Sequence, residues 1–243
     1  MSLSLAWIEW RRLMRTPFAW GTLALCLCLC LLSWQFLGTL ESFSGMQTAH
    51  RELGLSHHLS LQLYGLAAVL ILLITPILTA RLFSETFRNG SYALLSSAPL
   101  SNLSILTGKF IAVVGYLSML VLIPLLLCLT ISSGTDLDLG LLLAATLGLL
   151  LLSGTFTGIG LYFSALSENP GIAAAASYGM LMLLSLLDQH TQASSFIHWL
   201  AWPSHYLDLQ LGLVRLSDIA YFLLLTLFFL GLALHRLDRR RRG

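Results

Sequence analysis

The sequence predicts an all-α integral membrane protein with six transmembrane helices and both termini in the cytoplasm. Three observations predict it: the composition, the lengths of the apolar runs and the placement of the basic residues. Hydrophobic residues make up 57% of the 243 residues and charged residues only 10%, and the mean hydropathy is +0.83. Soluble domains carry about a quarter charged residues because their surface must be wetted. This chain has too few charges for such a surface, so lipid is the expected solvent.

Six apolar runs are long enough, or nearly long enough, to cross a bilayer. A spanning helix needs roughly 20 apolar residues to cross a hydrocarbon core about 30 Å thick. Backbone amides inside lipid must be paired within the segment, which makes each run a helix. The runs are residues 18–40, 59–80, 110–131, 139–163, 171–187 and 216–234. The fifth is short, and Asp218 dilutes the start of the sixth. We expect one transmembrane domain over residues 1–243.

The basic residues indicate the orientation. With the N-terminus inside, all of the 13 lysines and arginines except Arg51 and Arg215 fall in the cytoplasmic segments. Such an asymmetry across short loops obeys the positive-inside rule. Six spans also place both ends on one side, and both ends are basic, including the tail at residues 235–243. The cytoplasmic set is Arg11, Arg12, Arg15, Arg81, Arg88, Lys109, Arg236, Arg239, Arg240, Arg241 and Arg242.

Residues 3–15 are expected to form an amphipathic helix before the first span. Leu5, Ile8 and Leu13 supply apolar contacts, while Glu9 and the neighbouring arginines supply charge. Trp7 suits the headgroup layer of a bilayer. We expect this helix to lie along the inner membrane surface. The alternative is a simple basic anchor that sets the topology.

The segment between the second and third spans, residues 81–104, predicts a helical elbow on the cytoplasmic face. It begins as a continuation of the second helix and stops at Asn89-Gly90, which tolerate the left-handed conformation. A second short helix is expected before Pro99. Phe83 and Phe87 are expected to be exposed, as is Tyr92. An ordered apolar elbow longer than a connector needs indicates a docking surface for a partner. The alternative is a helix lying on the membrane.

The sequence contains no familiar catalytic motif. The pair Gly108-Lys109 lacks the first glycine of a P-loop, and Phe110 replaces the hydroxyl residue that would hold magnesium. Asp188 and Asp218 flank helix ends instead of facing each other within the membrane, which disfavours an intramembrane aspartyl protease. We therefore expect no enzymatic activity in this chain and no ATP or magnesium bound to it.

Histidines gather in the predicted outer loops. We interpret them as solvated residues at the interface, and a copper or zinc site is the alternative. They are His50, His57, His58, His190, His198 and His205. No charged residue falls near the centre of a span, where such residues mark ion paths. This disfavours an ion-coupled carrier and favours an energy source outside the membrane domain, such as an attached ATPase.

Four stretches resemble type-2 ABC transporter permeases, and among them the short gliding-motility-like (GldF-like) branch. The first is Arg81-Leu-Phe-Ser-Glu-Thr-Phe-Arg-Asn-Gly-Ser-Tyr-Ala-Leu-Leu with the following Ala98-Pro-Leu-Ser and Gly108-Lys-Phe. The others are Leu166-Ser-Glu-Asn, Ser204-His-Tyr-Leu-Asp with Gly212, and Asp218-Ile-Ala-Tyr through the basic tail. Their order and spacing cover nearly the whole chain.

The resemblance implies a multi-pass permease of the bacterial inner membrane that acts as an exporter. It implies two cytoplasmic ABC ATPase subunits, which carry the ATP and magnesium, and a second permease subunit, identical or similar. A periplasmic accessory protein is a further expected partner, and nucleic acid is not. The alternative is a membrane anchor that transports nothing and lets an ATPase regulate an envelope machine.

The resemblance also assigns candidate site residues. The elbow would dock the ATPase, with a second contact at the link between the fourth and fifth helices. The family elbow has two adjacent acids, whereas Glu85 here is followed by Thr86 and Phe87. That departure favours an apolar contact through Phe83 and Phe87. The assigned residues are Arg81, Phe83, Glu85, Phe87, Arg88, Gly90 and Leu94 in the elbow, and Glu168 and Asn169 in the link.

Overall fold

The protein is a bundle of long helices. The computed structural model describes residues 2–44, 57, 60–89, 101–131, 138–187 and 199–242, and every regular element in these ranges is helical. The elements are α1 (Ser2–Met14), α2 (Pro17–Ser44), η1 (Ser60–Tyr64), α5 (Gly65–Arg88), α7 (Asn102–Ile131), α8 (Leu139–Leu166), α9 (Pro170–Leu186), α11 (Trp202–Gln210) and α12 (Leu216–Arg242).

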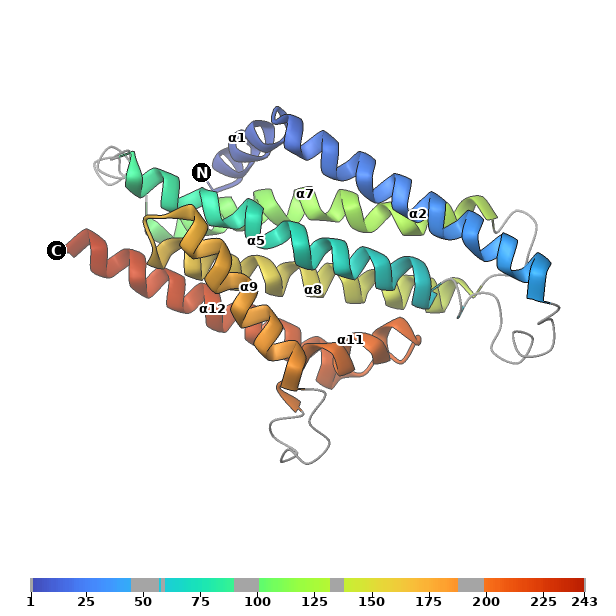
Figure 1. Cartoon of the computed structure of the whole chain (residues 1–243). Helices are drawn as coiled ribbons and strands as arrows, with labels where there is room; N and C mark the ends of the chain where they lie inside the picture. Colours follow the sequence, from blue (N-terminus) through green and yellow to red (C-terminus); the bar gives the residue numbers. More distant parts are fainter. Residues whose placement is uncertain are drawn as a thin grey trace.

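Helix α8 forms the centre of the bundle and packs against α5, α7, α9 and α12. Helix α1 crosses α7 at one end and is bent by 68° from the start of α2. Both chain termini lie at that end of the bundle (Figure 1), which we call the terminal end. The C-terminal ends of α5, α8 and α12 and the N-terminal ends of α7 and α9 meet there.

Glycines allow α8 to approach its neighbours closely. A Cβ atom at Gly160 would lie 2.8 Å from the Cβ of Thr79 in α5. One at Gly158 would lie 3.3 Å from the carbonyl oxygen of Thr226 in α12. Small residues on facing surfaces let helices pack closely within membranes. Such packing matters there because the hydrophobic effect does not drive helices together in lipid.

Four helical segments are long and apolar enough to cross a membrane, and a bent pair raises the total to five. The four are Ser60–Arg88, Asn102–Thr130, Leu139–Leu166 and Leu216–Arg241, and the pair is Ala6–Met14 with Ala19–Leu32. The fifth predicted span corresponds to α9, a shorter apolar helix of 17 residues. The chain is therefore an all-helical protein with four to five apolar spans among its described residues.

Two helix boundaries and one loop differ clearly from the prediction. Helix α7 begins at Asn102, eight residues before the predicted third span, and includes Lys109. Helix α12 continues to Arg242, so the predicted basic tail is helical. Leu237 is buried in this extension, and such packing stabilises a helix beyond its apolar span. The predicted outer loop before α12 contains α11, which has a proline in its first turn.

Candidate functional site

The terminal end brings together most of the predicted contact residues. A small hydrophobic cluster there joins four helices: Phe83 of α5, Ile105 and Leu106 of α7, Leu161 and Ala165 of α8, and Ala233 and Leu237 of α12. This cluster is separate from the main core of the bundle. The last turns of α5 are therefore fixed to the rest of the protein by apolar packing.

The predicted exposure of Phe83 is wrong. Its side chain is 1% exposed and lies in the cluster. The ammonium group of Lys109 lies 5.4 Å from the centre of its ring. Phe87, one turn later, is half-buried, and the two rings stack with centroids 6.2 Å apart. Because residues four apart share a helix face, both aromatics face the chain itself. A docking contact through Phe83 is excluded in this conformation.

Serine hydroxyls join the end of α5 to the end of α8. The Oγ of Ser164 accepts hydrogen bonds from the backbone N–H groups of Phe83 and Ser84, at 3.0 and 3.3 Å. It donates to the carbonyl oxygen of Ala80 at 2.9 Å. The Oγ of Ser84 donates to the carbonyl oxygen of Ser167 at 2.7 Å. Sequence reasoning missed this contact, although Ser164 between the apolar Phe163 and Ala165 was a usable signal.

Helix α12 adds polar contacts from its extended end. The Nη1 of Arg240 lies 3.2 Å from the Oε1 of Glu168, and its guanidinium lies 4.2 Å from the ring centre of Phe87. The Oδ1 of Asp238 accepts a 2.7 Å hydrogen bond from the side-chain amide of Asn102. The ends of α5, α7 and α12 and the α8–α9 link are thereby connected. Glu168 itself is 67% exposed.

The remaining predicted contact residues divide into exposed and structural ones. Arg81 and Glu85 face outward and form a loose pair at 4.0 Å, and Arg88 is exposed at the end of α5. Helix α5 ends at Arg88, and Asn89 is its C-cap, where the sequence predicted a stop. Asn169 caps α9: its Oδ1 accepts from the N–H of Gly171 at 2.9 Å. Gly90 and Leu94 lie outside the described residues, as does the predicted second helix of the elbow.

Helix α1 is attached to α7 by a buried ion pair. The Nζ of Lys109 lies 2.8 Å from the Oε1 of Glu9, and the side chains are 5% and 15% exposed. Removing one member of such a pair leaves an uncompensated charge, which costs several kcal/mol. Sequence reasoning used Lys109 for orientation and did not predict this partner.

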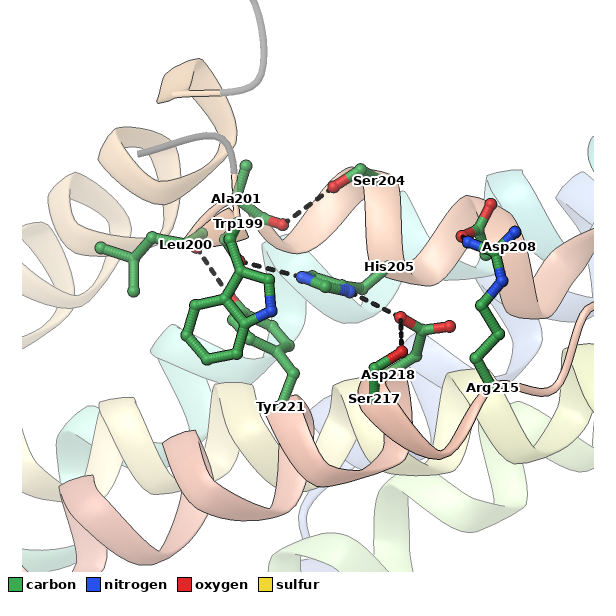
Figure 2. Close-up of polar contacts among 10 residues, drawn as sticks. All are labelled: Trp199, Leu200, Ala201, Ser204, His205, Asp208, Arg215, Ser217, Asp218 and Tyr221. Carbon is green, nitrogen blue, oxygen red and sulfur yellow. Dashed lines mark hydrogen bonds and ion pairs between the residues drawn. The ribbon is translucent and has the colours of Figure 1, made fainter. Parts of the chain in front are cut away.

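A second polar cluster lies at the opposite end, where α11 meets α12 (Figure 2). The Nδ1 of His205 lies 2.7 Å from the Oδ1 of Asp218, and its Nε2 lies 2.9 Å from the carbonyl oxygen of Trp199. The imidazole stacks on Tyr221 with centroids 4.3 Å apart. His205 and Asp218 are 8% and 2% exposed. For His205 the interpretation as a solvated interfacial residue is therefore wrong.

Further hydrogen bonds near this end attach α11 to η1. The hydroxyl of Tyr206 donates to the carbonyl oxygen of Tyr64 at 2.9 Å, and burial raises the pKa of Tyr206 well above its usual value. The Oγ of Ser60 and the backbone carbonyl of Gln210 form a 2.7 Å hydrogen bond. No group of three or more potential metal ligands occurs in the part of the chain that the structure describes. This cluster holds helices together.

A bundle of apolar spans, with ion pairs near its ends, defines a multi-pass membrane protein. The family model described as ABC-2 family transporter protein matches residues 3–242. The chain therefore belongs to the ABC-2 transporter family, whose membrane subunits work with ATP-binding subunits and are not catalytic themselves. No curated protein matches the chain.

Proposed function

We propose that the chain is a permease subunit of a bacterial inner-membrane ABC exporter of the GldF-like branch. Its six spans would be α2, η1 with α5, α7, α8, α9 and α12. Helix α9 has 17 residues, which corresponds to about 26 Å at 1.5 Å per residue and lies at the lower limit for a span. The resemblance of the elbow and of the stretch before α12 supports the branch and the outward direction.

Both termini would lie in the cytoplasm. The ends of α5 and α12 carry Arg81, Arg88 and the arginines from Arg236 to Arg242, and all of these segments meet at the terminal end. Arg215 lies at the other end, before α12. The positive-inside rule then assigns the terminal end to the cytoplasm.

The terminal end would receive the ATPase. One observation carries this proposal: the end of α5, the α8–α9 link and the end of α12 are joined by Ser84–Ser164 and Arg240–Glu168 contacts. A force on the exposed residues Arg81, Glu85 or Glu168 would therefore move three spans together. Two ATPases would dock on two permease chains, and ATP and magnesium would bind only to the ATPases.

The first test is recovery of the partner. We expect the tagged chain, purified from its native membrane in mild detergent, to bring along a P-loop ATPase. Glu85→Lys should reduce that recovery, because it reverses a charge on the proposed docking surface. Asp208→Lys is a matched control, since Asp208 also pairs with an arginine, Arg215, but at the opposite end. Absence of any P-loop chain, or equal loss in both variants, would refute the proposal.

A second test separates docking of the ATPase from transmission of its movement to the permease helices. Ser84→Ala removes the hydroxyl that donates from α5 to Ser167, whereas Thr86→Ala removes one that bonds only within α5, to Leu82. We expect Ser84→Ala to leave ATPase recovery unchanged and to reduce the change in ATPase rate that the permease causes. An equal effect of the two variants on that rate would contradict transmission through Ser84.

A further inference from the structure

A cavity of about 340 Å³ opens between α1, the last turns of α5 and Lys109 of α7. Its lining changes in character along α5. Ile77 and Leu78 line the part farther from the terminal end, and Arg81 and Glu85 line the part nearer to it. The cavity therefore has an apolar inner side and a charged mouth. Arg81 and Glu85 also belong to the proposed docking surface, whereas Glu168 and Arg240 do not line the cavity.

The charges at the mouth are not balanced. Glu9 is engaged by Lys109 at 2.8 Å, and Glu85 is loosely paired with Arg81 at 4.0 Å, with both side chains well exposed. Arg12 also lines the cavity, and it makes no hydrogen bond or ion pair with any residue that the structure describes. The lining thus carries one more cation than anions. Arg12 from α1 and Arg81 from α5 contribute guanidinium groups from two different helices.

We propose that this cavity binds an anionic phospholipid. The guanidinium groups of Arg12 and Arg81 would hold its phosphate, and the first part of an acyl chain would lie along Ile77 and Leu78. A guanidinium matches the geometry of a phosphate and forms charge-assisted hydrogen bonds with it. Basic groups beside a membrane attract anionic lipid of the cytoplasmic leaflet. The inference rests on the proposed orientation, which puts the charged mouth at headgroup level.

The apolar inner side selects a lipid over a soluble anion. Ile77 is 37% exposed within the chain, and covering such surface is favourable only for a ligand that has an apolar part. A bound lipid would also connect α1 to α5, which the Lys109–Glu9 pair does not do. It would thereby stabilise the position of α1 beside the last turns of α5, at one edge of the proposed ATPase-docking surface.

Native mass spectrometry of the purified full-length chain tests the site. Phosphatidylglycerol and phosphatidylcholine with identical acyl chains are added at equal concentration. We expect the wild type to retain phosphatidylglycerol in preference to phosphatidylcholine. The double variant Arg12→Gln/Arg81→Gln should bind phosphatidylglycerol about tenfold more weakly, because it loses charge-assisted hydrogen bonds. Both replaced side chains are exposed, so the thermal unfolding of the variant should match that of the wild type.

The matched control is Arg15→Gln/Arg88→Gln. It also removes one exposed arginine from the α1 region and one from α5, but neither residue lines the cavity. Equal weakening in the two double variants would show general electrostatic attraction and overturn the proposal, as would equal retention of the two lipids. Displacement by soluble glycerol phosphate at the affinity of the lipid would assign the site to a free anion and also overturn it. Lipid retention needs no ATPase, so the outcome is independent of the partner test.

Discussion

Replacing His205 by phenylalanine should strongly destabilise the end of the bundle that lies opposite the terminal end. The substitution keeps a flat ring on Tyr221 but removes both polar atoms of the imidazole. Asp218, 2% exposed, would then lose its 2.7 Å partner and the only cation beside it among the described residues. Its Oδ1 would keep a long 3.4 Å bond from the Ser217 hydroxyl, and its Oδ2 already has no partner there. Leaving a buried charge unpaired costs about 3–5 kcal/mol.

Asp218→Asn provides the comparison. The carbonyl oxygen of Trp199 can only accept, so the Nε2 of His205 carries a hydrogen and a neutral ring has Nδ1 as an acceptor. An asparagine amide at position 218 can donate to that Nδ1. The substitution therefore exchanges a charge-assisted bond for a neutral one and should cost about 1 kcal/mol.

Thermal unfolding in detergent, followed by tryptophan fluorescence, measures the difference. For a chain of this size, each kcal/mol corresponds to about 2–4 °C. His205→Phe should lower the Tm by on the order of 10 °C, and Asp218→Asn by about 2–4 °C. A His205→Phe variant as stable as Asp218→Asn would refute the reasoning, because Asp218 would then not depend on the imidazole.

Two further predictions concern packing and orientation. Gly160→Ala should destabilise the protein by about 1–3 kcal/mol, because overpacking forces helices apart. Gly231→Ala should stabilise it by up to about 1 kcal/mol through helix propensity, since a Cβ there meets nothing within 4 Å. Comparing the two Tm values checks this, and equal Tm values would contradict the close α8–α5 contact. A membrane-impermeant maleimide should label Arg215→Cys but not Arg88→Cys in intact spheroplasts, and the reverse result would invert the proposed orientation.

The sequence by itself determined the features that depend on local chemistry. Apolar runs of sufficient length imply membrane helices because unpaired backbone amides are too costly in lipid. Helix α5 stops before Asn89, where the turn residues of the sequence predicted a stop, and α9 begins at Pro170, one residue before its predicted apolar run. These signals act within a few residues and need no knowledge of neighbouring helices.

The burial of Phe83 and His205 was decided by tertiary structure. In a membrane protein, apolar residues occur on every face of a helix, so hydrophobic periodicity does not reveal which face meets protein and which meets lipid. Phe83 faces inward because α7, α8 and α12 converge on its side of α5. His205 is buried because α11 places it opposite Asp218.

Some helix boundaries were also decided by tertiary contacts and not by the local sequence. Helix α7 begins before its apolar run and α12 continues beyond its own, because Asn102 bonds to Asp238 and Leu237 is packed in the cluster of the terminal end. From the sequence, Lys109 served only to indicate the membrane orientation. In the structure it forms an ion pair with Glu9 of α1. Contacts between residues far apart in the chain stabilise these segments, and such pairings arise only when the bundle assembles.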